Sequence, residues 1–277
     1  MGIRARASQL WRLLATGFCF AVFGLGGVVL GLLVFPTVRL LSANPERARR
    51  NIQAGVSRSF RVFVWLMKTL GVLSYEVRNV QDLRARGRLI VANHPTLIDV
   101  VLLIGLMPEV DCVVKRGLFL NPFLRGPVSW AGYIPNSTPQ RLVSDCTDAL
   151  RARRSLIIFP EGTRSVPGQP LRMKRGAAQV ALAADADIVP VTIRCEPMTL
   201  TKSEPWYRIP ARRPHWTLSV GQAFPARAAV VADCAAPLAA RRLTEHFVHY
   251  FDNGATRAGA LAPAAAALSA QTNAVPA

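Results

Sequence analysis

Residues 88–106 read RLIVANHPTLIDVVLLIGL. A short apolar run opens this stretch, a longer apolar run closes it, and polar residues separate the two. A short apolar run bounded by turn residues is typical of a buried strand, whereas a longer run indicates a helix. We therefore predict a strand over residues 88–92 and a helix over residues 95–106, with His94 and Asp99 close to the junction.

The junction carries residues suited to proton transfer. Pro95 fits the first helical position, which would place His94 at the start of the helix, where the helix dipole keeps an imidazole neutral at pH 7. Asp99 follows His94 at a spacing of about 140° around an ideal helix, so the two side chains meet only if His94 bends back over the first turn. In contact, the carboxylate would fix the imidazole tautomer and stabilise the imidazolium. Taken alone, a His and an Asp at this spacing more often have a capping or core role.

A second polar motif, FPEGTRS at residues 159–165, follows the apolar run SLIIF. Charged residues in a glycine turn beyond a buried strand lie where open α/β sheets bind ligands. Arg164 could bind a phosphate through two N–H groups, and Gly162 would let a substrate approach the backbone. The alternative is a turn in which Glu161 and Arg164 only pair with each other.

Apolar strand-like runs alternate with helical segments over the middle of the chain, which predicts an α/β domain with a largely buried sheet. The further predicted strands are residues 75–80, 111–115, 155–159, 187–194 and 216–221, and the further predicted helices are residues 138–151, 175–184 and 237–252.

The N-terminal region contains a membrane-like segment. Residues 13–35 carry no charge, and as a helix they extend about 35 Å, enough to cross the hydrocarbon layer. The run ends at Pro36 without a signal-peptide cleavage pattern. Because basic residues flank the run on both sides, the positive-inside rule gives no orientation, and both a true crossing and a monotopic hairpin stay open.

A second N-terminal helix is predicted from Asn44 and Pro45, a cap followed by proline, to about Leu73. Its basic residues fall on one side. They are Arg47, Arg50, Arg58, Arg61 and Lys68. We favour a helix that lies in the membrane interface with these residues among anionic headgroups, over a core helix with a solvated face.

The composition limits the class of protein. Of the 277 residues, 51% are hydrophobic, which excludes disorder for most of the chain, and the net charge is +18. Such a charge favours anionic headgroups, an acidic carrier protein or nucleic acid. The last is disfavoured, because no recognition module accompanies the membrane-like run. Five scattered cysteines indicate neither a disulfide scaffold nor a zinc site.

Three motifs in this order, NHPTLID, FPEGTRS and IVPVTI (residues 188–193), resemble the glycerolipid acyltransferase family, which includes the 1-acylglycerol-3-phosphate acyltransferases and other lysophospholipid acyltransferases. The resemblance spans roughly residues 75–225. It implies an α/β fold, a mixed sheet flanked by helices as in a glycerol-3-phosphate acyltransferase-like domain, behind an N-terminal membrane-embedded helical anchor.

The resemblance also implies the roles of the site residues. His94 is the general base that takes a proton from an acceptor hydroxyl, and Asp99 orients it. The hydroxyl attacks an acyl thioester of acyl carrier protein or coenzyme A, without a covalent acyl-enzyme and without a permanently bound cofactor or metal. Pro190 helps to shape the acyl-donor site. The acceptor is bound by Glu161, Gly162, Thr163, Arg164 and Lys174.

Two departures from the family pattern bear on the acceptor. Gly117 replaces an acidic residue, and Thr138 stands where the family has an arginine that helps to bind phosphate. Arg116, Arg125 or Arg141 could compensate. The acceptor is therefore 1-acyl-glycerol-3-phosphate, another lysolipid or an aminolipid precursor, and a non-catalytic phospholipid-binding protein stays a rival.

The predicted organisation has three parts: a membrane helix with a basic amphipathic helix over residues 1–74, an acyltransferase domain over residues 75–253, and an Ala-rich disordered tail over residues 254–277. Acyl thioesters are cytosolic, which places the catalytic domain on the cytoplasmic side of the inner, or cytoplasmic, membrane. Among the tryptophans, Trp11 and Trp65 fit interface anchoring, whereas Trp130, Trp206 and Trp216 are interpreted as packing residues.

Overall fold

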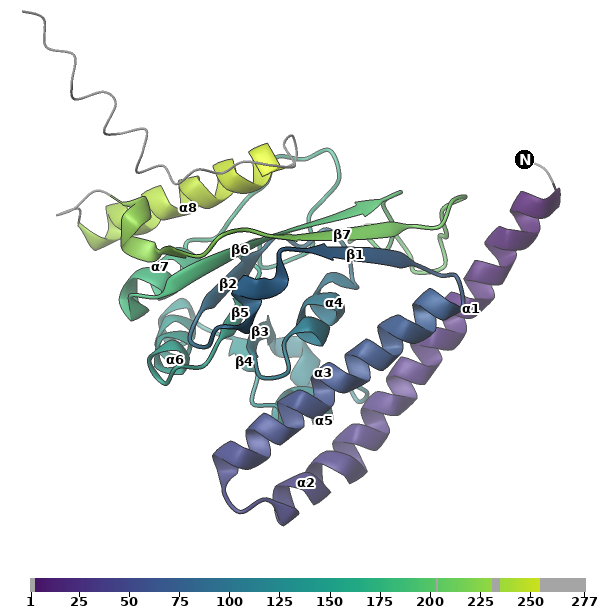
Figure 1. The fold of residues 1–277 in the computed structure, drawn as a ribbon, viewed down its shortest axis with the longest axis horizontal. Coiled ribbons are helices and arrows are strands. Elements are labelled where there is room, and N and C mark those ends of the chain that lie inside the picture. Colours follow the sequence, from purple (N-terminus) through teal and green to yellow (C-terminus); the bar gives the residue numbers. More distant parts are fainter. Residues whose placement is uncertain (1–2, 203, 231–234, 255–277) are drawn as a thin grey trace, which may run out of the picture.

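The computed structural model describes residues 3–202, 204–230 and 235–254; the predicted Ala-rich tail lies outside them except for its first residue. An N-terminal helical hairpin packs along one side of an α/β domain (Figure 1). The predicted α/β fold is confirmed, and so is the mixed sheet flanked by helices that the family resemblance implies.

The first arm of the hairpin is a nearly continuous helix. α1 (Ile3–Val29) passes through a π-helical turn (Leu30–Val34) into α2 (Phe35–Leu41), so Pro36 does not end the helix but lies in the first turn of α2. Residues 6–41 are long and apolar enough to cross a membrane, and 22% of the most apolar window is buried inside the protein.

The second arm is α3 (Pro45–Thr69), which returns alongside α1 (Figure 1). The predicted cap is confirmed, because the Asn44 side chain accepts a hydrogen bond from the Arg47 backbone N–H at 2.7 Å. The apolar face of α3 is buried against the protein, with Ile52, Val56 and Phe63 in the core, and the five basic residues of the predicted stripe are exposed. α3 is therefore a core helix with a basic outer face, and contact of that face with anionic headgroups stays a prediction.

The sheet has the strand order β1-β7-β6-β2-β5-β3-β4, with β8 paired to β6. β7 and β8 run antiparallel to β6, and the other pairs are parallel. The strands are β1 (Ser74–Arg78), β2 (Leu89–Ala92), β3 (Asp111–Lys115), β4 (Ile134–Asn136), β5 (Leu156–Ile158), β6 (Asp187–Glu196), β7 (His215–Val220) and β8 (Phe224–Pro225). The six predicted strands are present, and the two that were not predicted, β4 and β8, are the short ones.

Helices cover both faces of the sheet. α3 and α4 (Asp99–Leu106) contribute to one core cluster, together with residues of α1. α6 (Pro139–Arg151), α7 (Gly176–Ala184) and α8 (Ala236–Gly254) contribute to a second cluster beyond the other face. α5 (Arg125–Trp130), which was not predicted, and 3-10 turns at Val80–Arg84, Arg116–Phe119 and Ala226–Ala229 complete the described elements.

A buried carboxylate joins the hairpin to the sheet. Asp111, at the start of β3, is 1% exposed and forms an ion pair with Arg49 of α3. Its Oδ1 also accepts a hydrogen bond from Gln53 Nε2 at 2.8 Å, and Arg154 Nε lies 3.1 Å from its Oδ2. Because an unpaired buried charge is costly, these contacts keep α3 in one position on the domain.

Candidate active site

The two polar motifs meet because of the strand pairing. β2 lies between β5 and β6 and runs parallel to both, with Val91 opposite Ile158 and Pro190. The carboxyl ends of parallel strands lie at the same edge of a sheet, which is where open α/β sheets bind ligands. His94, which follows β2, and Glu161, which follows β5, are therefore neighbours.

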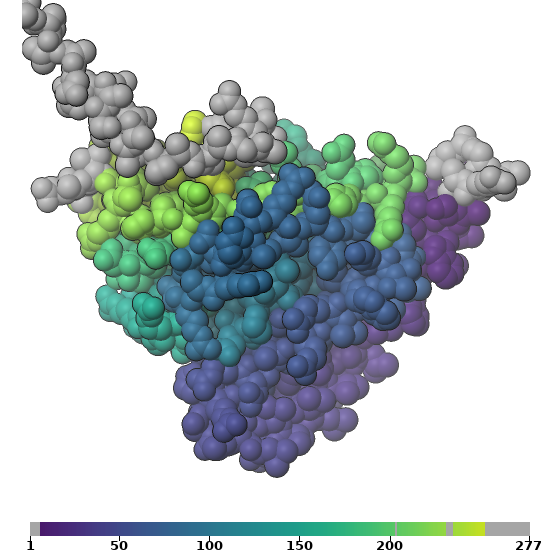
Figure 2. All heavy atoms as spheres, viewed as in Figure 1, coloured from purple at the N-terminus to yellow at the C-terminus, as the bar shows by residue number. Residues whose placement is uncertain are grey.

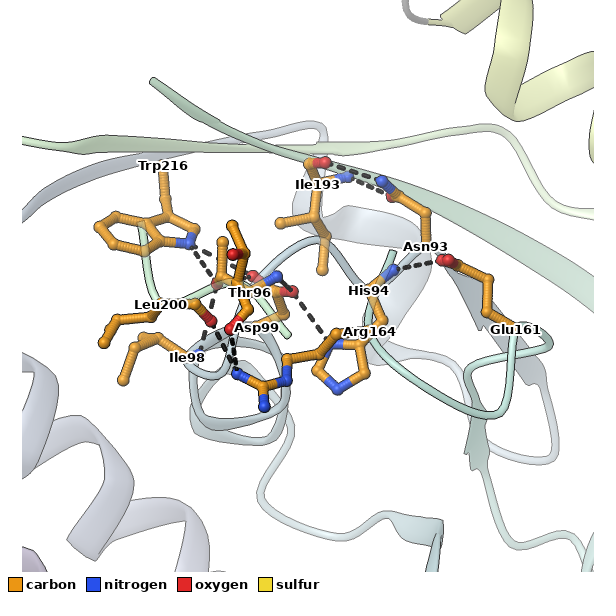
Figure 3. Close-up of polar contacts among 11 residues, drawn as sticks. Asn93, His94, Thr96, Ile98, Asp99, Glu161, Arg164, Ile193, Leu200 and Trp216 are labelled. Carbon is orange, nitrogen blue, oxygen red and sulfur yellow. Dashed lines mark hydrogen bonds and ion pairs between the residues drawn. The ribbon is translucent and has the colours of Figure 1, made fainter. Parts of the chain in front are cut away.

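His94 and Asp99 are in direct contact. His94 Nδ1 lies 2.9 Å from Asp99 Oδ2, and the Asp99 side chain is fully buried while that of His94 is 18% exposed (Figure 3). The imidazole ring also packs on Phe159, with ring centroids 4.5 Å apart. An ionised carboxylate only accepts, so the neutral ring carries its proton on Nδ1 and leaves Nε2 free to accept one.

The start of α4 differs from the prediction. The helix begins at Asp99 and not at Pro95, so His94 lies in a loop and not in a first helical turn. Asp99 Oδ2 accepts a hydrogen bond from the Thr96 backbone N–H at 2.5 Å, and Asp99 Oδ1 accepts one from the Thr96 hydroxyl at 2.5 Å. These side-chain bonds hold residues 94–98 in a non-helical loop. His94 is therefore not in the first helical turn, where the helix dipole was expected to keep its imidazole neutral. The loop itself brings His94 to Asp99.

Trp216 completes the surroundings of Asp99. Its indole Nε1 lies 3.2 Å from Asp99 Oδ1 and 3.0 Å from Thr96 Oγ1, and the residue is 1% exposed. The sequence alone indicates only a packing role for Trp216. Trp216 reaches the site from β7, 117 residues along the chain from Asp99, and no local sequence pattern reports such a contact.

Glu161 holds the loop that carries His94. Its Oε1 accepts a hydrogen bond from the His94 backbone N–H at 2.8 Å, and the Ser165 N–H donates to the His94 carbonyl at 2.8 Å. Burial raises the pKa of Glu161, partly offset by its hydrogen bonds with the His94 backbone and the Ser165 side chain. Within the described part of the chain, no ion pair joins Glu161 to Arg164, so the simple paired turn is not observed.

Arg164 donates hydrogen bonds to a neighbouring segment of the chain. Its Nη1 donates to the Leu200 and Thr201 carbonyls at 2.9 and 2.8 Å, and the Leu97 N–H donates to the same Leu200 carbonyl at 3.1 Å (Figure 3). Arg164 thus joins the FPEGTRS turn to the segment that follows β6. Phosphate binding by Arg164 stays a prediction. Because Nη1 is bonded to these carbonyls, a phosphate would have to bind the other N–H groups of the guanidinium.

The remaining predicted binding residues gather on the same turn. Gly162 has a φ of +67°, and a Cβ there would lie 3.0 Å from Lys174 Nζ. Glycine is needed both for this left-handed conformation and for the approach of the ammonium group. Lys174 is held there by its backbone N–H, which donates to the Pro160 carbonyl at 2.8 Å. Thr163, which follows Gly162 in the chain, is half-buried.

Other residues named from the sequence lie outside this cluster of contacts. Pro190 is buried within β6, and Thr138 is exposed at the start of α6. Arg116 and Arg125 are exposed, and Arg141 lies 3.8 Å from Asp145 on its own helix. Within the described residues, no group of three or more His, Cys, Asp or Glu side chains is arranged to hold a metal ion.

The sequence and the fold both match known proteins. A family model described as "Acyltransferase" matches residues 74–194, the segment that carries both motifs. Over these residues the chain is similar to the acyltransferase family. The chain is 27% identical over 153 residues to a 1-acyl-sn-glycerol-3-phosphate acyltransferase of Pseudomonas aeruginosa, covering 53% of this chain and 59% of that protein. It is 34% identical over 137 residues to the human 1-acyl-sn-glycerol-3-phosphate acyltransferase beta, covering 47% and 49%. These matches therefore span about half the length of the relatives.

The structural comparison extends beyond the segment that the family model matches. The crystal structure of the 1-acyl-sn-glycerophosphate acyltransferase from Thermotoga maritima aligns with a TM-score of 0.67 and 17% identity, covering 91% of this chain and 99% of that one. Because the alignment covers most of both chains, the likeness in fold includes the N-terminal hairpin of this protein.

The raised pKa of Glu161 gives a pH-dependent prediction. A carboxyl whose pKa is raised by folding stabilises the fold at low pH, and this contribution is lost as pH rises through the folded-state pKa. We expect wild-type stability to fall, relative to Glu161→Gln, as pH rises from the ordinary pKa value of 4.5 towards neutrality. Glutamine keeps an oxygen for the His94 N–H but carries no charge. Urea unfolding across this range measures the difference.

Glu245→Gln is the matched control, because Glu245 forms an exposed pair with Arg241 on α8. We expect its stability difference from wild type to stay small and nearly independent of pH. Two results would contradict the raised pKa of Glu161. One is a stability difference between wild type and Glu161→Gln that does not change with pH, and the other is a wild type that becomes more stable relative to the variant as pH rises.

Proposed function

We propose that the protein is a membrane-bound O-acyltransferase that moves a fatty acyl chain from an acyl carrier protein or coenzyme A thioester to a lysolipid hydroxyl, with 1-acyl-glycerol-3-phosphate as the first acceptor. The contact between His94 Nδ1 and the fully buried Asp99 carries this proposal. It leaves a neutral nitrogen, Nε2, at the ligand-binding edge of the sheet. The relatives named above support the choice of reaction.

The proposed reaction follows from these groups. His94 Nε2 takes the proton of the acceptor hydroxyl, and the oxygen attacks the thioester carbonyl carbon. The C–S bond then breaks, the new ester remains, and the thiolate takes up the proton from the His94 imidazolium. Asp99 stabilises that imidazolium while it exists. The acyl group passes directly to the acceptor without an acyl-enzyme.

The acceptor headgroup is assigned to the FPEGTRS turn. Lys174 Nζ lies against Gly162 there, and the other N–H groups of the Arg164 guanidinium are on the same turn. An ammonium and a guanidinium suit a phosphate monoester. Because Thr138 offers no cation, another lysolipid or an aminolipid precursor is the second candidate acceptor.

The catalytic proposal predicts a specific loss of activity. We expect His94→Ala and Asp99→Asn to lower acyl transfer about 10²–10⁴-fold, the usual contribution of general acid–base catalysis, with vesicle binding unchanged. The assay incubates purified protein with labelled acyl-carrier and acyl-coenzyme A thioesters across a panel of lysolipids and identifies the products by mass spectrometry.

His215→Ala is the control, because His215 is a half-buried histidine that pairs with Ser74 on the sheet. It should keep wild-type activity. Wild-type transfer rates in His94→Ala would refute the base assignment. Lipid binding without any thioester consumption by the wild type would select the non-catalytic rival.

We also propose that the hairpin lies in one leaflet and does not cross the membrane. The domain contacts the first arm of the hairpin at several points: Gln9 Nε2 donates to the Ile209 carbonyl, the Gly17 backbone faces Trp206, and Gly31 in the π-helical turn lies against Gly126. A crossing would carry these polar loops into the hydrocarbon, where backbone groups find no water. Arg12 is also unavailable to headgroups, because it is 6% exposed and donates to the Pro210 and Ala211 carbonyls.

The outward side of α1 supplies the lipid contact. Large apolar side chains recur there at helical spacing, namely Leu10, Trp11, Leu14, Phe18, Val22, Leu25, Val29 and Leu32, each at least 41% exposed. Trp206 continues this surface, with its ring 6.0 Å from that of Phe20. Leu97, near His94 in the loop, is 44% exposed. An acceptor could therefore reach His94 from the bilayer. Location at the cytoplasmic membrane, facing the cytosol, follows from where thioesters occur.

Substitutions on this surface give the next prediction. We expect the triple variant Leu14→Ser, Phe18→Ser and Leu25→Ser to bind anionic vesicles at least about a hundredfold more weakly, because each large apolar side chain contributes about 1.5–3 kcal/mol on burial. Vesicle co-sedimentation measures the binding. Leu238→Ser on α8, 44% exposed and outside this surface, is the control that should bind as wild type. Equal binding by the triple variant, or an N-terminal tag protected on the far side of sealed vesicles, would refute the monotopic arrangement.

A further inference from the structure

The Thr96 hydroxyl has a fixed direction. Its oxygen accepts a hydrogen bond from Trp216 Nε1 at 3.0 Å and one from the Ile98 backbone N–H at 3.3 Å. A hydroxyl has two lone pairs and one hydrogen, so with both lone pairs used, its hydrogen is left for Asp99 Oδ1 at 2.5 Å. Trp216 thereby makes Thr96 a donor towards Asp99.

The two oxygens of Asp99 are divided between two tasks. Oδ1 receives the Thr96 hydroxyl and, at 3.2 Å, the indole N–H of Trp216. Oδ2 receives the Thr96 backbone N–H and faces His94 Nδ1 at 2.9 Å. Thr96 and Asp99 are 0% exposed and Trp216 is 1% exposed, so water does not readily replace a missing donor.

We propose that Trp216 is a positioning residue for the acyl transfer: its indole N–H, directly and through the Thr96 hydroxyl, holds the Asp99 carboxylate with Oδ2 on His94 Nδ1. The proposal rests on the proposed function. Trp216 touches neither substrate nor reacting atoms and acts on His94 only through Asp99. A carboxylate held in this way keeps the neutral imidazole as the Nδ1–H tautomer, which is the form that can accept a proton at Nε2.

The test removes the N–H and keeps the shape. Benzothienylalanine, in which sulfur replaces the indole N–H, is introduced at position 216 by stop-codon suppression, and Trp216→Phe is made beside it. We expect kcat to fall about tenfold, because the indole N–H donates to the charged Asp99 carboxylate. KM should stay within about twofold, because this hydrogen bond does not involve the substrate. Thr96→Val should act in the same direction, and its effect should not add fully to that of the benzothienylalanine variant, since both act on Asp99 Oδ1.

A spectroscopic readout separates positioning from packing. The chain has four histidines, so ¹⁵N-labelled imidazoles can be assigned by comparison with His94→Ala. We expect the neutral His94 ring to be the Nδ1–H tautomer in the wild type and a mixture of both tautomers in the benzothienylalanine variant. The same replacement of Trp130, whose N–H donates to the Gly31 carbonyl at 3.1 Å away from the dyad, should leave the His94 spectrum and kcat unchanged.

Two results would overturn the proposal. One is a benzothienylalanine variant with wild-type kcat and a wild-type His94 spectrum. The other is a loss of kcat with an unaltered His94 tautomer and a lowered unfolding temperature, which assigns Trp216 to packing alone. If the wild type transfers no acyl chain to any acceptor, the proposed function fails, and the ¹⁵N spectra still decide whether Trp216 positions the dyad.

Discussion

The contact between the buried Asp99 carboxylate and the His94 ring is the interaction on which the rest of the site depends. A buried carboxylate is tolerated only when donors surround it, and here the donors come from the loop of residues 94–98 and from β7. The loop is held in turn by Glu161, through the His94 backbone N–H. The sheet therefore completes the site, because β2, β5 and β7 must be paired before Glu161 and Trp216 can bond to this loop.

The helical hairpin is built as part of the domain. Figure 2 shows that the hairpin forms one side of the molecule and that its surface is continuous with that of the rest of the domain. Asp111 joins α3 to β3. Close backbone approach at Gly31 and Gly126 joins the π-helical turn to α5, where a Cβ on Gly31 would lie 2.7 Å from the Gly126 Cα. In the proposed monotopic arrangement, a rigid connection of this kind would fix the height of the catalytic loop above the lipid. The depth of α1 in the bilayer would then decide which part of an acceptor can reach His94.

Much of the architecture could be predicted from the sequence, because β2, β5 and β6 are short apolar runs bounded by turns, and both motifs follow such runs. The contact between His94 and Asp99 was also expected. The loop that produces it was not, because Thr96 prefers the Asp99 side chain to the helix, a competition that periodicity does not report. The contribution of Trp216 and the bonds of Arg164 to the Leu200 and Thr201 carbonyls depend on tertiary contacts between distant segments. β4 was too short, at three residues, to leave a pattern.

The central claim is that His94 Nε2 receives the proton of an alcohol presented from the bilayer while Asp99 holds Nδ1. A crystal or cryo-electron structure of the protein in a lipid nanodisc, with a lysolipid acceptor and a thioether analogue of the acyl donor, measures this most directly. The account predicts the acceptor hydroxyl within about 2.6–3.2 Å of His94 Nε2, with the Asp99 contact intact. An acceptor hydroxyl bound by another group, with Nε2 turned away from it, or a separated His94 and Asp99, would contradict the account.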